Sequence, residues 1–193
     1  AAQSAAAPAS TPVPVYRGEG TEARAPGGGG TGAIIPAMAE ARAFFTATQL
    51  DDGQLLVAGG AGIDATSLAS SELYDPATNK WSATGSMTDP RKNHTATLLQ
   101  DGRVLVVGGR NLDVAIHASA EIYSPTSGAW ESAGSMVNDR TLHVAVMLQD
   151  GRVLVTGGVN DNYDVRKSAE IYDPVTGSWS ETGDMLKGRQ WHT

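Results

Sequence analysis

The sequence repeats itself with a period of 49 residues. Four methionines, Met38, Met87, Met136 and Met185, are each separated by this step. The same step links the double glycines Gly59-Gly60, Gly108-Gly109 and Gly157-Gly158, the tyrosines Tyr74, Tyr123 and Tyr172, and the tryptophans Trp81, Trp130 and Trp179. A period of about 40 to 50 residues is typical of a propeller blade or a helical solenoid, so the chain must stack copies of one small unit.

Strand signals inside each unit decide between these two architectures. In the second unit two apolar runs, 95–99 and 103–107, flank Asp101-Gly102, which is a hairpin signal. A third apolar run, 119–123, leads through the turn 125–128 into a strand that Trp130 opens. Each unit therefore predicts four short antiparallel strands, and the chain is expected to be an all-β propeller.

The repeat sets the predicted boundaries. We expect three blades, at 38–86, 87–135 and 136–184, and the start of a further blade at 185–193. Residues 1–37 are rich in alanine, glycine and proline, so they are expected to form a flexible arm. Their first residues resemble the small-residue side of a signal-peptidase cut, which predicts a secreted, periplasmic or cell-surface protein.

Three blades are too few to close a ring, because propellers typically have four to eight. We expect completion by further chain or by a second copy that joins as three plus three blades. Residues Gly32 to Met38 fall where an outer strand should precede the first unit, and Ile34-Ile35 is the expected strand.

Composition excludes several classes of function. The net charge of −7 disfavours a nucleic-acid partner, since binding to phosphates needs cations. The absence of cysteine excludes a disulfide, a thiolate zinc site and a cysteine nucleophile within this sequence. No apolar run approaches the roughly 20 residues of a membrane span.

The double glycine, the tyrosine 14 residues after its second glycine and the tryptophan seven residues further on resemble the kelch repeat. The resemblance covers residues 38–193. The longer string from Met87 through Arg91 and His94 to Gly109 is most similar to bacterial exported kelch proteins, and it is also similar to the propeller of galactose-oxidase-like copper radical enzymes. The resemblance implies that the first strand of each blade lies nearest the axis and the fourth at the rim.

The repeated residues predict packing roles. Glycine permits a positive φ or a close backbone approach, and the aromatic rings are large enough to fill the space between blades. Four arginines recur with the same period: Arg42, Arg91, Arg140 and Arg189. We expect them to pair with the repeated acids Glu72, Glu121 and Glu170.

A histidine follows three residues after each of the last three arginines, at His94, His143 and His192, whereas Phe45 stands at this position in the first unit. A ring of histidines near an axis predicts a metal or proton-transfer site. The structural alternative is that each histidine bonds backbone. Because the position tolerates Phe45, the structural alternative is favoured and no metal or cofactor is expected.

The segments that follow the double glycines, 61–66, 110–117 and 159–167, share almost no sequence, whereas the hairpins and the turns at the other connections are nearly constant. Alternate connections of a blade share a face, so the variable segments are expected on one face, which is the candidate binding face. Its candidate residues are Arg110, Asn111, Asp113, His117, Asn160, Asp161, Asn162, Tyr163, Asp164 and Arg166.

The third variable segment offers oxygen ligands that could hold calcium, but the glycine and the terminal glutamate of a calcium loop are missing. Turn formation by asparagine and aspartate explains the segment without an ion. Contact with a partner or a glycan is the third alternative.

No catalytic motif is present. A Gly-x-Ser-x-Gly elbow does not occur, and the glycines at 27–30 are not followed by the residues of a phosphate loop. The sequence favours a non-enzymatic binding or scaffold module for a protein or carbohydrate partner. One alternative is a structural subunit of a larger extracellular assembly. The other is a fragment of a propeller enzyme: a sugar mutarotase, or a copper radical oxidase whose tyrosine-linked cysteine this sequence lacks.

Overall fold

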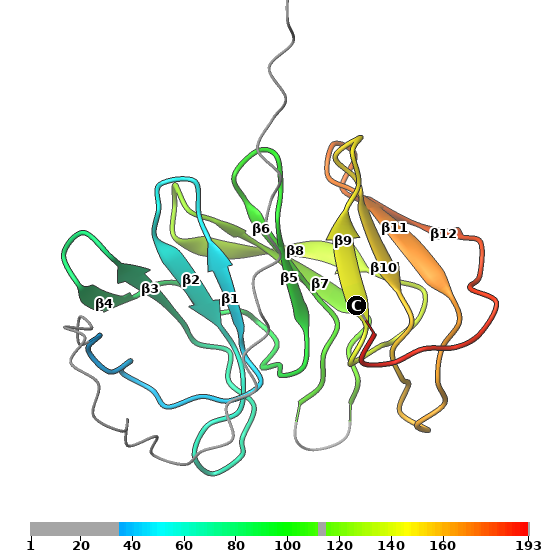
Figure 1. The fold of residues 1–193 in the computed structure, drawn as a ribbon, viewed down its shortest axis with the longest axis horizontal. Coiled ribbons are helices and arrows are strands. Elements are labelled where there is room, and N and C mark those ends of the chain that lie inside the picture. Colours follow the sequence, from blue (N-terminus) through cyan, green and yellow to red (C-terminus); the bar gives the residue numbers. More distant parts are fainter. Residues whose placement is uncertain (1–34, 112–114, 193) are drawn as a thin grey trace, which may run out of the picture.

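The computed structural model describes residues 35–111 and 115–192, and these residues form three four-stranded antiparallel sheets (Figure 1). The predicted arm lies outside them apart from its last three residues. The strands of the first sheet are β1 (Thr46–Gln49), β2 (Leu55–Ala58), β3 (Ser71–Asp75) and β4 (Lys80–Ala83). The second sheet holds β5 (Thr95–Leu98), β6 (Val104–Val107), β7 (Ser119–Ser124) and β8 (Ala129–Ser135). The third holds β9 (Val144–Met147), β10 (Val153–Thr156), β11 (Ala169–Asp173) and β12 (Ser178–Thr182).

Each sheet is a blade in which strands that follow one another in the chain are hydrogen-bonded neighbours, which confirms the predicted fold. The Asp-Gly turns close the first hairpin of every blade. Gly53, Gly102 and Gly151 all have a positive φ, between 82° and 87°, which explains why glycine follows aspartate there. No helix long and apolar enough to cross a membrane occurs in 35–111 or 115–192.

The first strand of each blade lies innermost. Strands β1, β5 and β9 are neighbours in space, and Figure 1 shows β4 at the left and β12 at the right of the molecule, away from them. The Asp-Gly hairpins lie at the top of this view and the variable segments at the bottom. The two kinds of connection therefore occupy opposite faces, as the sequence predicts.

The core lies between neighbouring blades. All four residues of β6 are fully buried, and Leu105 and Val107 pack against Val153 and Val155 of the third blade. Because both faces of this middle strand are covered, its sequence is continuously apolar rather than alternating.

The repeated aromatic residues seal the outer part of each interface. Tyr123 and Trp130 pair with ring centroids 5.2 Å apart, and Trp130 Nε1 donates to Gly85 O at 3.0 Å, at the end of the preceding blade. Trp81 donates to Pro36 O at 2.8 Å in the same way. These contacts confirm the predicted packing role of the tryptophans.

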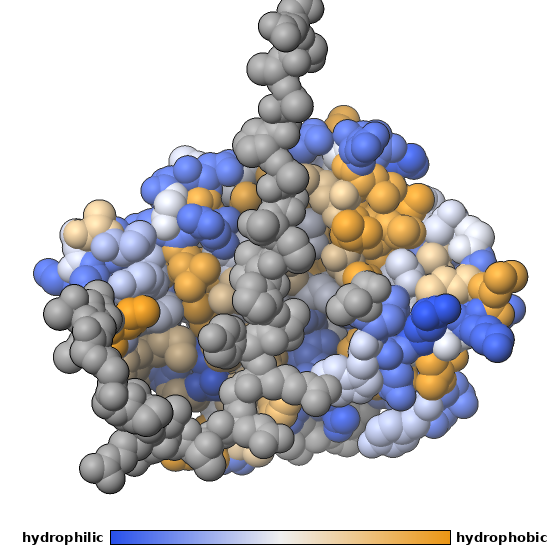
Figure 2. Space-filling model, in the orientation of Figure 1, coloured by the Kyte–Doolittle hydropathy of each residue, from blue (hydrophilic) through white to orange (hydrophobic). Residues whose placement is uncertain are grey.

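The ring of blades is open among the described residues. Leu99, Leu105 and Ile122 of the second blade are buried, whereas their counterparts in the third blade are partly exposed: Leu148, Leu154 and Ile171. The inner strand β9 exposes Val146 (48%) and Met147 (38%), and Figure 2 shows this apolar surface. The third blade therefore exposes the apolar face that the second blade buries against its neighbour.

The segment 185–192 covers part of that face. Gly158 N donates to Arg189 O at 2.7 Å, just as Gly109 N donates to Arg140 O at 3.0 Å one interface earlier. A second copy that docked here would meet this segment. Completion by further chain or by a second copy stays a prediction.

The described residues just before the first blade, 35–37, form no strand. Ile34 lies outside the described residues, and Ile35 is 59% exposed and pairs with no strand within them. A strand needs a neighbour to satisfy its backbone groups, and the described residues offer Ile35 none.

Candidate functional site

Three of the four repeated arginines, Arg42, Arg91 and Arg140, are buried and connect segments of their own blade, whereas Arg189 is exposed. Arg91 Nη1 donates to Gly108 O at 2.7 Å and to Ser119 O at 3.0 Å, while Nη2 lies 2.9 Å from Glu121 Oε1. The other oxygen of Glu121 accepts Thr88 N at 2.7 Å. The pairs Arg42–Glu72 and Arg140–Glu170 repeat this geometry. Arg42, Arg91 and Arg140 thus form the predicted Arg–Glu pairs.

These charges are satisfied within the fold. Burial lowers the pKa of Arg91, and the charge of Glu121 opposes that effect. Burial also acts to raise the pKa of Glu72, but hydrogen bonds from Ala39 N and Arg42 outweigh it, so that this pKa lies below its ordinary value. Each buried pair therefore has its counterion within the same blade.

The double glycines let adjacent blades approach. A Cβ on Gly59, whose φ is +63°, would lie 2.5 Å from Arg91 O and 2.8 Å from His94 Cε1. Only glycine fits between these two groups.

The repeated histidines bond hydroxyl groups of the preceding blade. His94 Nε2 lies 2.9 Å from Thr46 Oγ1, and His143 Nε2 lies 2.9 Å from Thr95 Oγ1. The structural alternative predicts that each histidine bonds a backbone group. The partner of Nε2 is instead a side-chain hydroxyl. The first blade offers no histidine at this position, because Phe45 replaces it.

The third interface obtains its hydroxyl from a different strand. Val144 stands where the first two blades have threonine, and the partner of His192 Nε2 is Thr156 Oγ1, at 3.3 Å. Val144 and Thr156 are paired across β9 and β10. In the third blade the hydroxyl therefore comes from β10 instead of β9, and the contact with histidine is kept.

Burial makes these histidines poor acids and bases near neutrality. It lowers the pKa of His94 and of His143 to about 3, and the positive charges of Arg91 and Arg140 add to the effect. Both rings are therefore neutral at pH 7, which removes the basis for proton transfer. In the described part of the chain, no three histidine or acidic side chains are grouped so as to hold a metal ion.

The bases of the three variable segments share one backbone frame despite the unrelated sequences. A backbone hydrogen bond closes each of them: Gly62 N to Thr66 O (2.9 Å), Asn111 N to Ala115 O (3.2 Å) and Asn160 N to Asp164 O (3.2 Å). The three donors are 49 residues apart, and so are the acceptors. We call the segments 61–67, 110–116 and 159–165 loops 1, 2 and 3, and the face that they form the loop face.

Further features support the common frame. Each loop base is a pair of isolated bridges, and in loop 3 Val159 pairs with both Thr141 and Val165. Ala65 in loop 1 and Tyr163 in loop 3 have nearly the same positive φ, 65° and 63°. The sequence signal was too weak to reveal this likeness, because neither residue is glycine.

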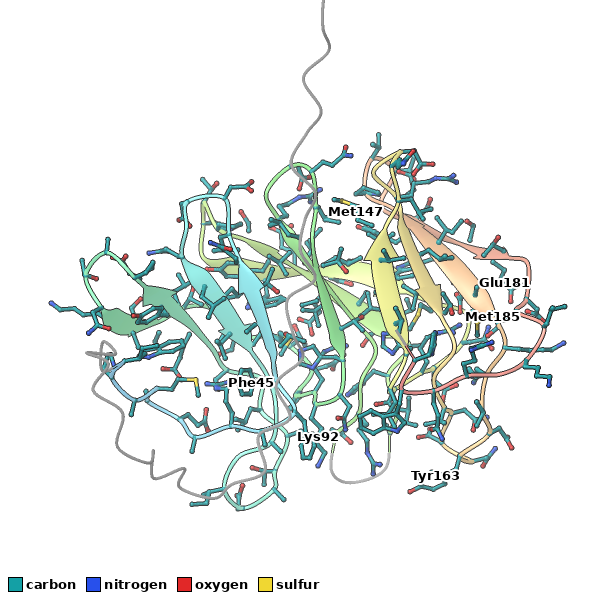
Figure 3. All side chains as sticks on the ribbon, in the orientation of Figure 1. Phe45, Lys92, Met147, Tyr163, Glu181 and Met185 are labelled. Atoms are coloured by element: carbon teal, nitrogen blue, oxygen red, sulfur yellow. The ribbon has the colours of Figure 1, made fainter. Side chains whose placement is uncertain are left out.

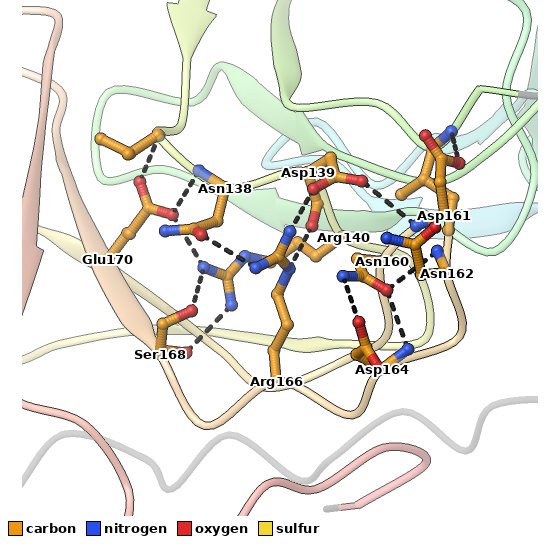
Figure 4. A network of polar contacts seen from close by, with 12 residues as sticks. Asn138, Asp139, Arg140, Asn160, Asp161, Asn162, Asp164, Arg166, Ser168 and Glu170 are labelled. Carbon is orange, nitrogen blue, oxygen red and sulfur yellow. Dashed lines mark hydrogen bonds and ion pairs between the residues drawn. The ribbon is translucent and has the colours of Figure 1, made fainter.

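Loop 3 is held by its own polar side chains (Figure 4). Asn160 Oδ1 accepts Asn162 N at 3.0 Å and Asp164 N at 2.8 Å, and Asn160 Nδ2 donates to Asp164 Oδ2 at 3.1 Å. The oxygens that suggested calcium are thus turn-forming acceptors. Tyr163 is left pointing outward, with 72% of its surface exposed (Figure 3).

Two predicted contact residues have internal roles. All three guanidinium nitrogens of Arg166 bond Asn138 or Asp139 (Figure 4). His117 occupies the same repeat position in the second blade, and its Nε2 lies 3.2 Å from Pro90 O. Both side chains tie a loop to the chain that precedes a buried arginine. Their shared register was the signal that could have shown this role.

Loops 2 and 3 meet at a pocket of about 160 Å³ lined by Arg110, Ala115, Ile116, Asp161 and Tyr163. Asp161 Oδ1 accepts Ile116 N at 2.8 Å and so joins the two loops. The structure therefore brings three predicted binding residues together, Arg110, Asp161 and Tyr163. Asn111 closes loop 2, and Asp113 lies outside the described residues.

Comparison with known proteins agrees with this geometry. A family model described as Kelch motif matches residues 90–137 and 140–186. The solved structure of YjhT is similar, with a TM-score of 0.66 and 16% sequence identity, over 77% of this chain and 54% of that one. This chain thus spans about half the length of that structure, and at this identity the likeness shows the fold alone. No curated protein matches the sequence.

Proposed function

The chain is built of kelch repeats folded as propeller blades, and on that premise we propose that it is a non-enzymatic module that binds a protein partner through its loop face. Kelch propellers commonly bind proteins, which supports this class of function. Fold alone does not determine function, so the proposal depends on the loop face itself.

The observation that carries the proposal is one backbone frame with three different sets of side chains. The frame is fixed by the closing hydrogen bonds of loops 1, 2 and 3, and the residues at the tips differ in every blade. If these loops served only to connect strands, nothing would require them to differ while the turns on the opposite face stay nearly constant. Recognition sites are commonly built this way, from variable loops on a rigid scaffold.

The chemistry of the tips favours a protein over a carbohydrate. Ile63 in loop 1 is 98% exposed, and loop 3 exposes Tyr163 and Val165. Aromatic and aliphatic side chains of this kind supply the apolar centre of protein interfaces. A carbohydrate site needs convergent polar groups, and the polar atoms of loop 3 bond one another instead.

The test compares two loop-tip variants with a matched control. Ile63→Ser and Tyr163→Ser change exposed side chains on the loop face, and Val175→Ser changes an equally exposed one, at 92%, in the turn between β11 and β12 on the opposite face. A tagged chain is used to capture partners from an extract, and the affinity of the isolated partner is then measured for each variant.

We expect the two loop-tip variants to weaken binding about tenfold or more, as for hot-spot residues, with Val175→Ser unchanged. Equal binding by all three variants would refute the proposal. Binding to a glycan array that depends on Tyr163 would show instead that the loop face recognises a carbohydrate.

A further inference from the structure

Two cations face each other at the base of loop 2. Lys92 and Arg110 form an isolated antiparallel bridge in which each backbone N donates to the other's O at 2.9 Å. Directly opposed residues have Cβ atoms within about 5.5 Å, so these two charged side chains start side by side. The corresponding residues are neutral in the other blades: Ala43 with Ala61, and Thr141 with Val159.

This arrangement costs stability, because like charges opposed across a bridge repel. Both side chains are half-buried, and neither forms an ion pair with any residue in 35–111 or 115–192. Burial lowers the pKa of Lys92, and the charge of Arg110 lowers it further. The net charge of the chain is −7, and yet this cation pair has no ion-pair partner among the described residues.

Three described acids around the bases of loops 2 and 3 have other partners. Asp89 bonds Arg91 and Ser119, and Asp139 bonds Arg166. Asp161 lines the same pocket as Arg110, and its Oδ1 is occupied by Ile116 N. No described acid forms an ion pair with Lys92 or Arg110.

The pair lies on the loop face beside the pocket between loops 2 and 3. Figure 3 shows Lys92 and Tyr163 at the same, lower face of the molecule. The pocket volume of about 160 Å³ is below the roughly 300–1,000 Å³ of a typical small-molecule site. It has room for one side chain of a partner, and its wall offers the guanidinium of Arg110 and the ring of Tyr163.

We propose that Lys92 and Arg110 select a partner that carries an acidic side chain, whose carboxylate binds between the two cations at this pocket. A carboxylate accepts charge-assisted hydrogen bonds from both groups and removes their mutual repulsion. This inference rests on the proposed function and names the chemistry of the partner.

The test uses a fluorescent hexaglutamate peptide as the probe and a hexaglutamine peptide as its neutral match, read by fluorescence anisotropy. The variant Lys92→Thr with Arg110→Val places the residues of the third blade at the same positions of the second, so the frame is kept. The control Arg103→Gln with Arg152→Gln removes the same charge from the hairpins of the opposite face.

We expect the unaltered chain to bind hexaglutamate at low salt, and the loop-base variant to bind it at least about tenfold more weakly. Binding should fall as salt is raised, and the control should match the unaltered chain. Asp161→Asn keeps the acceptor for Ile116 N and removes a negative charge, so it should tighten binding. The variant should unfold at the same or a higher denaturant concentration, which excludes misfolding as the cause.

Equal binding of hexaglutamate by the loop-base variant, equal binding of hexaglutamine, or no binding of hexaglutamate at low salt would overturn the inference. If the loop-tip variants lose the captured partner while the loop-base variant retains it, the inference fails and the proposed function stands. If the loop-tip variants retain the partner, the proposed function itself fails.

Discussion

The guanidinium of Arg140 lies 2.7 Å from the carboxylate of Glu170, and both side chains are completely shielded from solvent. Glu170 also accepts the backbone N–H groups of Val137 and Asn138, at 2.7 and 3.1 Å. One ion pair thus connects the chain that enters the third blade to its third strand. Three copies of this joint give the blades a common geometry.

Removing one partner of this pair should be strongly destabilising. Arg140→Met leaves the charge of Glu170 buried without its counterion, so we expect the free energy of unfolding to fall by about 3–5 kcal/mol. The measurement is urea denaturation followed by tryptophan fluorescence. Arg152→Gln, which breaks the exposed pair with Asp150, is the control and should leave the midpoint almost unchanged. Similar midpoint shifts for the two variants would contradict the structural role of the buried pair.

The double glycine should tolerate no side chain. Alanine at Gly59 has an unfavourable positive φ, and its Cβ also collides with Arg91 O and His94. Gly177 has a similar φ of +67° but open space around it, so Gly177→Ala measures the backbone cost alone, about 1 kcal/mol. We expect Gly59→Ala to cost at least about 1 kcal/mol more in denaturant titrations. Equal costs would show that the blades can separate to admit a methyl group.

The hydroxyl group that bonds His143 should work equally well when it is supplied by β6 instead of β5. Thr95→Val leaves Nε2 of the buried ring without its partner, which should cost about 1–3 kcal/mol. Val107 faces Thr95 across β5 and β6, in the register that Val144 and Thr156 occupy in the third blade. Adding Val107→Thr should therefore restore most of the loss. A double-mutant cycle measures the coupling, and strictly additive costs would rule out the exchange.

Acid should destabilise the fold through the buried histidines. The folded pKa of His94 is lowered from 6.5 to about 3, so between these values the unfolded chain binds a proton that the folded chain does not. Stability is therefore lost as the pH falls from about 6.5 towards 3. The double variant His94→Phe with Thr46→Val introduces the residue types of Phe45 and Val144. We expect it to reduce the slope of the melting temperature against pH in this window. An unchanged slope would mean that His94 is charged or solvated in the fold.

Much of the fold follows from residues that repeat. Asp-Gly hairpins, the double glycines and the Tyr–Trp pairs predicted the blades, and the common spacing of Arg91 and Glu121 predicted their ion pair. These features are local or strictly periodic, so one sequence suffices to reveal them. The strand expected at Ile34-Ile35 could not be judged from one sequence, because it needs a backbone partner from another strand.

The candidate site was less predictable for physical reasons. Side-chain hydrogen bonds held loop 3 in the same frame as loop 1, although Tyr163 and Ala65 suggest no positive φ. Arg166 looked like a contact residue because an isolated loop charge is usually exposed, whereas its guanidinium is bonded within the chain. The opposition of Lys92 and Arg110 depends on a bridge that no sequence signal specifies.

The central claim is that loops of common frame and different side chains carry recognition. Its most direct test replaces residues 160–164 of loop 3 with the sequence of residues 62–66 of loop 1, and measures partner affinity by surface plasmon resonance beside a thermal melt. We predict a melting temperature within a few degrees of the unaltered chain, since the closing hydrogen bond is kept, and at least about a tenfold loss of affinity. An unchanged melt with unchanged affinity would contradict the claim.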